Sequence, residues 1–147
     1  MHRQDVTELV LAAKRSAGLT WAAIALEVGR SKEWTTAALL GQMAMSEDHA
    51  TIVGKLLDLP AEAVAVLTEA PYKGSLPTDV PTDPLIYRFH ELVSVYGTTF
   101  KALISEEFGD GIMSAIDFSM DIEREPDPKG DRVRITMSGK FLPYREY

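Results

Sequence analysis

The sequence predicts an α+β protein, made of an amino-terminal helical bundle followed by a smaller domain with two helices and a β-hairpin. Up to about residue 70, apolar residues recur at helical spacing in short stretches that glycines and capping residues separate. After residue 111, apolar and polar residues alternate, which is typical of a strand with one buried face. Residues 71–83 are rich in proline and indicate an extended linker. We therefore expect two domains, at residues 1–75 and 76–147.

The first domain is expected to hold five short helices. Gly18 and Gly29 end the first two, because glycine takes the left-handed conformation that closes a helix at little steric cost. The residues expected to begin the later helices are Thr20, Ser31, Ser46 and Pro60. The apolar residues expected inside the first three are Leu9, Val10, Ala13, Trp21, Ile24, Ala25, Val28, Trp34, Ala37, Ala38 and Leu40.

The second and third helices have the layout of a helix-turn-helix. In that layout a recognition helix offers side chains to the edges of bases, and here those side chains are Ser31, Lys32, Glu33 and Thr35. A small DNA-binding regulator that dimerises through its second domain is therefore one candidate function. The charge disfavours it, because residues 1–75 hold 7 Lys and Arg against 9 Asp and Glu, a balance of −2. DNA binding needs cations that displace condensed counterions.

The composition excludes several kinds of site. The 147 residues include no cysteine, so disulfides, thiolate nucleophiles and cysteine metal ligands are ruled out. The histidines His2, His49 and His90 form no metal-ligand spacing, and we expect neither a metal nor an organic cofactor. A formal charge of −7 disfavours nucleic acids and anionic membranes as partners. No apolar run approaches the ~20 residues of a membrane span, and the first residues lack the layout of a secretory signal, so the expected location is the cytosol.

The second domain is expected to begin with two helices. Asp83 followed by Pro84 is a helix start, since proline suits the first helical position and the aspartate oxygen accepts a free amide proton. Gly97 is expected to end this helix, and Thr98 or Thr99 to cap a second one that continues to about Phe108.

The rest of the domain is expected to form a hairpin of residues 112–123 with 131–138, joined by a turn at 126–130. By alternation, one face of the first strand carries Ile112, Ser114, Ile116, Phe118, Met120 and Ile122, and the other carries Asp117, Ser119, Asp121 and Glu123. A two-stranded hairpin is marginal alone, and this apolar face is larger than two short helices readily cover. We therefore expect a second subunit to cover it.

Three polar residues of this domain are candidate site residues. Arg88 and Glu91 lie three apart on a helix, close enough for their side chains to meet. The simplest interpretation is an exposed ion pair worth a few tenths of a kcal/mol. Ser114 lies among apolar residues, where a hydroxyl needs a partner, and a bond to a nearby carbonyl is its simplest interpretation.

The run YRFHELVSVYGTTFKALISEEFGDGIMSAIDFSMDIEREPDPKGDRVRITMSGKFLPY resembles the carboxy-terminal part of the cyanases, also called cyanate hydratases or cyanate lyases. In that family the catalytic residues are the arginine and glutamate of the Y-R-x-x-E helix and the serine of the G-I-M-S-A-I-D-F strand. The resemblance places them at Arg88, Glu91 and Ser114. His90, where many relatives carry an aromatic residue, and Phe100, where leucine is common, depart from the family pattern outside these three positions.

The resemblance also implies an activity and an assembly. Cyanases join cyanate and bicarbonate to give carbamate and carbon dioxide, and the carbamate then breaks down to ammonia and carbon dioxide. They are decamers built from dimers, with interlocked carboxy-terminal domains and active sites between subunits. Their amino-terminal domain is similar to repressor DNA-binding domains but is not used on DNA, and the G-L-T-W and G-R-S spacing here fits it.

Overall fold

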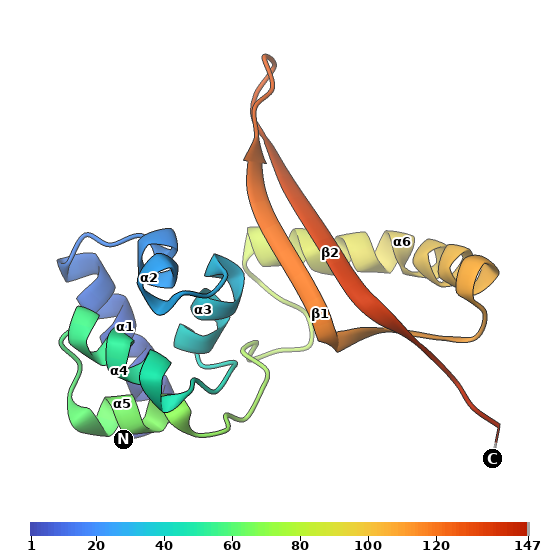
Figure 1. Cartoon of the computed structure of the whole chain (residues 1–147). Helices are drawn as coiled ribbons and strands as arrows, with labels where there is room; N and C mark the ends of the chain where they lie inside the picture. Colours follow the sequence, from blue (N-terminus) through green and yellow to red (C-terminus); the bar gives the residue numbers. More distant parts are fainter. Residues whose placement is uncertain (147) are drawn as a thin grey trace. The chain divides into compact units, whose positions relative to one another are not determined.

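A computed structural model describes residues 1–146, and its elements divide between two compact units, Met1–Ser75 and a second that begins at Leu76 (Figure 1). The elements are α1 (Arg3–Ser16), α2 (Trp21–Val28), α3 (Lys32–Leu39), α4 (Glu47–Leu56), α5 (Ala61–Thr68), α6 (Pro84–Phe108), β1 (Gly111–Glu125) and β2 (Arg132–Pro143). Five helices belong to the first unit, and one helix and the hairpin to the second. The predicted α+β class is confirmed.

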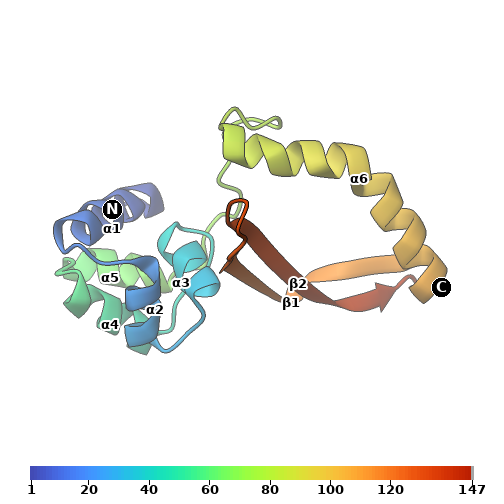
Figure 2. The same ribbon diagram turned by 90° about the horizontal axis from the view of Figure 1, so that it is seen from above.

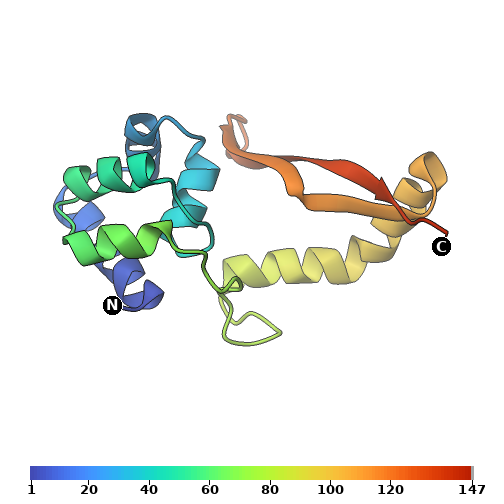
Figure 3. The ribbon, with the colours of Figure 1, turned by 60° about the horizontal axis from the view of Figure 1, so that its bottom comes forward.

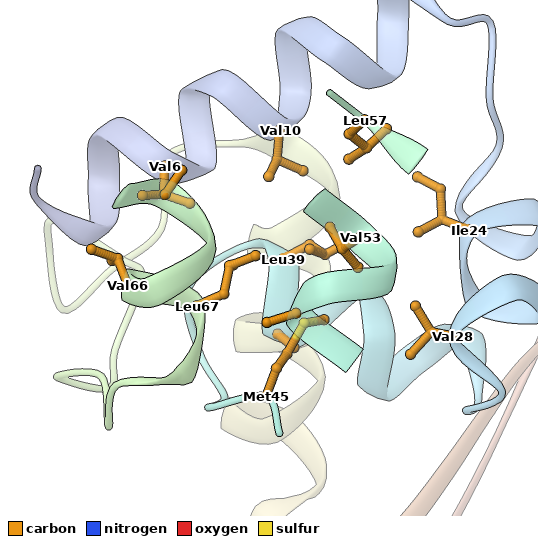
Figure 4. Packing of buried hydrophobic residues seen from close by; sticks show 13 residues of the cluster. Val6, Val10, Ile24, Val28, Leu39, Met45, Val53, Leu57, Val66 and Leu67 are labelled. Atoms are coloured by element: carbon orange, nitrogen blue, oxygen red, sulfur yellow. The ribbon is translucent and has the colours of Figure 1, made fainter. Parts of the chain in front are cut away.

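The first unit is a helical bundle around one apolar core to which all five helices contribute (Figure 4). Its buried residues are Val6, Val10, Ile24, Val28, Ala38, Leu39, Met45, Ala50, Val53, Leu57, Ala63, Val66 and Leu67. Two predicted apolar positions are wrong in detail: Leu9 and Leu40 are exposed, and Val6 and Leu39 are buried instead. The apolar stripe of a short helix is wide enough for either choice, and packing against the other helices selects the buried side.

The helix boundaries of this unit follow the predicted caps. The hydroxyls of Thr20, Ser31 and Ser46 accept the backbone N–H groups of Ala23, Trp34 and His49, at 3.1, 3.2 and 3.3 Å respectively. Gly29 closes α2 in the left-handed conformation, with φ 74°. These contacts are local in sequence, and they hold the ends of helices that are too short to be stable alone.

One set of side-chain hydrogen bonds in this unit was not predicted. The guanidinium of Arg3, at the start of α1, donates to the carbonyl oxygen of Val66 in α5, to that of Ala38 in α3 at 3.2 Å, and to that of Met43 at 2.5 Å. These carbonyls lie at or near the ends of α3 and α5, where backbone acceptors lack partners within the helix. Arg3 therefore joins three parts of the bundle.

No single helix in the described part of the chain is long and apolar enough to cross a membrane. Only α1 and α2 taken together reach the necessary length and composition, and they do so across a bend of 107°.

In the second unit, α6 runs without a break over 25 residues, so the predicted end at Gly97 is wrong. Its start agrees with prediction, because the Asp83 carboxylate accepts the N–H groups of Leu85 and Ile86 at 2.9 and 3.0 Å. A glycine inside a helix costs about 1 kcal/mol relative to alanine but still donates its N–H, so the helical hydrogen bonds continue through it. Figure 2 shows that α6 changes direction part way along its length while remaining continuous.

The strands β1 and β2 form an antiparallel hairpin and lie side by side along their length (Figure 3). The turn is closed by a bond from the N–H of Gly130 to the carbonyl of Asp127, at 3.0 Å. The predicted end of the second strand at residue 138 is wrong, because β2 continues to Pro143. Its last residues pair with the start of β1, Phe141 with Met113 among them, and this pairing is not visible from either strand alone.

A large β-bulge interrupts β1. Met113 pairs with Phe141 and Phe118 pairs with Gly139, so four residues of β1, 114–117, stand opposite the single residue 140 of β2. Paired residues share a face of the hairpin, and the partners of Met113 and Phe118, Phe141 and Gly139, are two residues apart on β2 and so share a face too. Met113 therefore lies on the same face as Phe118.

The bulge also corrects the predicted alternation in β1. From Phe118 to Ile122 the predicted face agrees with the register, since Met120 pairs with Met137 and Ile122 with Ile135. Before the bulge the prediction is wrong: Ile112 pairs with Leu142 on the opposite face, and Ile116 lies in the bulge itself. Extra residues in one strand shift the phase of its alternation.

Apolar side chains of this unit stay uncovered within one chain. No residue of α6 is buried. The helix meets β2 near its own end, where the ring of Phe108 stacks on that of Phe141 with centroids 5.2 Å apart. The large exposed apolar residues of α6 are Leu85, Ile86, Tyr87, Phe89, Leu92, Val93, Val95, Tyr96, Phe100, Leu103 and Phe108.

Candidate active site

The structure brings Arg88 and Glu91 together on α6. Arg88 Nη1 lies 2.5 Å from Glu91 Oε2, and the two side chains are 62% and 49% exposed. The Arg88 guanidinium also lies over the ring of Tyr87, 5.4 Å from its centroid. In water such a pair contributes only a few tenths of a kcal/mol to stability. The pair can instead serve chemistry, because Glu91 holds the Arg88 guanidinium in one orientation. A guanidinium has five N–H donors, and those that do not face Glu91 are available to an anion.

Ser114 lies at the first position of the bulge and is only 5% exposed. Its Oγ accepts the backbone N–H groups of Ile116 at 3.0 Å and Asp117 at 2.9 Å. The partners that the structure gives this hydroxyl are backbone amides, from which it accepts, rather than the nearby carbonyl of the simplest interpretation. A hydroxyl has two lone pairs and one hydrogen, so these amides occupy the lone pairs and leave the hydrogen for donation. Accepting two N–H groups also polarises the O–H bond and strengthens it as a donor.

Within the described residues, Ser114 is not bonded directly to the ion pair on α6. None of the hydrogen bonds or ion pairs among residues 1–146 joins Ser114 to Arg88 or Glu91. The ion pair and the oriented hydroxyl are thus two separate pieces of a candidate site, one on a helix and one in a hairpin.

Sequence reasoning missed the amides that hold Ser114, and it missed Gly139, the glycine of β2 against which the bulge packs. The sequence contains a pattern from which each of these two features could have been predicted. Serine hydroxyls often bond to backbone groups two or three residues away. A glycine inside a strand often marks a bulge or a close approach of two backbones.

The residues expected to read DNA are poorly placed to do so. Thr35 is completely buried in the bundle. The side chain of Glu33 is only 8% exposed and lies 2.7 Å from Lys32 Nζ. The hydroxyl of Ser31 caps α3. The arrangement therefore argues against the DNA-binding interpretation, as the charge does.

A hollow of about 670 Å³ in the first unit contains none of the predicted site residues. It is lined by Met1, Asp5, Glu8, Leu9, Ala12 and Glu62. A hydrogen bond from the Met1 amino group to Glu62, at 2.5 Å, raises the pKa of that amino group. The acidic lining is unsuited to an anionic substrate. Among residues 1–146 no group of three or more His, Cys, Asp or Glu side chains is arranged to hold a metal ion.

Two family models match the chain and together span most of it. Residues 3–71 match the amino-terminal domain of cyanate hydratase, and residues 78–146 match the cyanate lyase carboxy-terminal domain. The chain is 69% identical over 147 residues to the cyanate hydratase of Dechloromonas aromatica, with full coverage of both proteins. It is equally similar, at 69% and full coverage, to the cyanate hydratase of Ralstonia pickettii. Among solved structures, the cyanase from T. urticae is similar with a TM-score of 0.82 and 39% identity, over 94% of this chain and 96% of that one.

Proposed function

The chain belongs to the cyanate hydratase family of lyases, also called cyanate lyases or cyanases, and on this premise we propose that it decomposes cyanate in a bicarbonate-dependent reaction. The observation that carries the proposal is the similarity over the full length of the chain, in both units. The products are carbamate and carbon dioxide, and the carbamate then breaks down to ammonia and a second carbon dioxide.

The bonds of this reaction balance with cyanate, bicarbonate and protons alone. An oxygen of bicarbonate attacks the cyanate carbon and forms a new C–O bond, and the bicarbonate proton moves to the cyanate nitrogen. The bond between the shared oxygen and the bicarbonate carbon then breaks and releases carbon dioxide. One further proton on nitrogen gives carbamate. The difficulty is electrostatic, because two anions must meet while negative charge collects on their adduct.

Arg88 and Ser114 have the chemistry that this difficulty requires. Arg88 is always protonated and offers a planar fork of donors that matches a carboxylate-like anion. Ser114 offers an O–H donor whose lone pairs are already occupied by the Ile116 and Asp117 amides. Such donors are preset, so they stabilise developing charge without reorganising during the reaction. Positioning of the two reactants supplies most of the rate, and we expect neither a metal nor an organic cofactor, bicarbonate being a co-substrate.

Glu91 has two possible roles, orienting Arg88 or transferring a proton. The 2.5 Å contact with Arg88 supports the first role. Glu91→Gln keeps the size and a hydrogen-bond acceptor but removes the charge, so in the orienting role we expect a moderate loss of kcat and an unchanged pH profile. A proton-transfer role instead predicts a large loss of kcat and the disappearance of one limb of the pH profile. The measurement is kcat for ammonia release between about pH 6 and 9.

We further propose that the site is completed in a homo-oligomer, a decamer built from interlocked dimers. Two features of the single chain support this proposal: α6 buries no residue, and Ile116 is 98% exposed. Burial of such apolar surface is the main force for association. Assembly would also bring several copies of Arg88 together and make a positive pocket in a protein of net charge −7. The cytosolic location stays a prediction.

The proposed reaction is tested by ammonia release from cyanate in buffer freed of carbon dioxide, with and without added bicarbonate. We expect release only when bicarbonate is present. Initial rates are needed, because the carbon dioxide produced hydrates to bicarbonate and would start the reaction by itself. A sample without enzyme measures the spontaneous rate, and a chelator should leave the enzymatic rate unchanged. An initial rate independent of bicarbonate would contradict the mechanism.

Oligomerisation is tested on the apolar face of the hairpin. Met137, paired with Met120, is a large exposed residue of this face, and its neighbour Ser138 lies on the opposite face. We expect wild-type particles many times heavier than the 16.2 kDa chain in size-exclusion chromatography with light scattering. Met137→Asp should lower the particle mass and the activity together, because a charge cannot be buried unpaired. Ser138→Asp, the matched control, should leave both unchanged. A monomer with full activity would refute the intersubunit site.

A further inference from the structure

The bulge that carries Ser114 packs directly on a glycine of the other strand. A β-carbon on Gly139 would overlap the carbonyl oxygen of Ser114 and would lie 2.6 Å from Cγ of Met113. Gly139 is not one of the glycines with positive φ, so its backbone conformation is open to any residue. The requirement for glycine at this position is therefore close approach of two backbones rather than conformational freedom.

This contact constrains the hydroxyl as well as the backbone. The Ser114 carbonyl rests against Gly139, while the Ser114 Oγ is held by the amides of Ile116 and Asp117 within the same bulge. A shift of the Ser114 backbone moves the hydroxyl and changes its bonds to both amides. A misplacement of about 1 Å at a reacting centre is enough to cost on the order of 10² in rate.

We propose that Gly139 is a positioning residue that sets the place and the polarisation of the Ser114 hydroxyl. The inference rests on the proposed role of Ser114 in cyanate decomposition and goes beyond it, because it assigns a task to a residue without a side chain. Gly139 touches no substrate in this account and acts only through Ser114.

The hairpin contains a matched control in Gly111. A β-carbon there would overlap the carbonyl oxygen of Leu142 and would lie 2.5 Å from the Phe141 ring and 2.9 Å from Cα of Pro143. Gly111 is thus as crowded as Gly139 and lies in the same pair of strands, but none of these contacts involves Ser114. An effect of general damage to the hairpin should appear in both variants, whereas an effect on Ser114 should be specific to Gly139.

The experiment compares Gly139→Ala with Gly111→Ala in kcat, KM, particle mass and Tm. We expect Gly139→Ala to lower kcat on the order of 10²-fold with a much smaller change in KM, because a preset donor acts mainly on the transition state. Gly111→Ala should lower Tm to a similar extent but change kcat only a few-fold. Equal losses of kcat in the two variants would overturn the positioning role.

A double-mutant cycle shows whether Gly139 acts through Ser114. If it does, Gly139→Ala should cost at most about threefold in kcat when added to Ser114→Ala, because the hydroxyl is already gone. An undiminished loss in that background would mean that Gly139 acts elsewhere, and the inference would be wrong.

If Gly139→Ala fails to assemble, a second variant removes the clash between the new β-carbon and the Met113 side chain. Met113→Ala combined with Gly139→Ala removes the Met113 clash and leaves only the overlap with the Ser114 carbonyl. We expect this double variant to assemble and to remain slow. Recovery of full activity would show that Met113 was the critical contact, and failure to assemble would make Gly139 a folding residue. Either result overturns the inference.

The outcomes also separate this inference from the proposed function. Full activity of Ser114→Ala would refute the role of Ser114 itself. A slow Ser114→Ala together with a fast Gly139→Ala would leave that role intact and refute only the positioning by Gly139.

Discussion

Ser114→Ala is expected to lower kcat for ammonia release on the order of 10²–10³-fold, the usual cost of removing one donor from a preorganised anion site. The reason lies in the state of the hydroxyl. Its two lone pairs face the amides of Ile116 and Asp117, at 3.0 and 2.9 Å, so its hydrogen is the part left to bind an anion. Alanine removes this donor and changes little else in the shape of the chain.

The measurement is steady-state kinetics with both substrates, and Ser119→Ala is the matched control. Ser119 lies on the same strand, paired with Ser138, and should tolerate alanine without loss of rate. Because Ser114→Ala leaves two backbone N–H groups without their acceptor, it costs about 1–3 kcal/mol of stability where water does not replace the hydroxyl. Particle mass must therefore be shown to be unchanged before the loss of rate is assigned to the site. A wild-type rate in an assembled Ser114→Ala protein would make Ser114 a structural residue.

Arg88→Lys is the second variant with a large expected effect. Lysine keeps the positive charge but loses the planar fork, so it cannot present paired donors to an anion while it contacts Glu91. We expect kcat/KM to fall on the order of 10²-fold, because a point charge holds the two anions in a less defined geometry. A simple requirement for positive charge would instead leave the rate close to that of the wild type.

The chain offers a closely matched control for this substitution. Arg134 and Glu125 form another exposed pair, with Nη2 and Oε1 2.5 Å apart, the same separation as between Arg88 and Glu91. Arg134→Lys should change stability by at most a few tenths of a kcal/mol and leave the kinetics unaltered. If Arg88→Lys behaves in the same way, the pair on α6 is an ordinary surface ion pair and its assignment to the site is wrong.

The contacts of the candidate site residues could be predicted from the sequence to different degrees. The contact between Arg88 and Glu91 follows from their spacing on a helix, because residues three apart lie on one face whatever surrounds them. The surroundings of Ser114 do not follow from spacing. Its burial, its two amide donors and its contact with Gly139 all depend on a bulge, and a bulge is a property of two strands together.

The same distinction runs through the fold. Features that depend on neighbours along the chain could be predicted from the residues alone: the caps at Thr20, Ser31 and Ser46, the start of α6 at Asp83, and the reversal between the strands. Each is a hydrogen bond between residues two or three apart, so the residues that form it can be recognised in a short stretch of sequence.

Features that depend on residues far apart in the sequence could not be predicted in this way, because they form only when the chain is folded. Packing buries Leu39 rather than Leu40. The continuation of α6 through Gly97 has a local cause instead, because one glycine inside a helix costs only about 1 kcal/mol. Pairing with β2 places Ile112 on the face opposite Phe118. It also forms the bulge in which the Ser114 hydroxyl accepts the backbone amides two and three residues further on. Cross-strand register is set by contacts between residues far apart in sequence. The position of the bulge therefore cannot be predicted from the sequence of β1 alone.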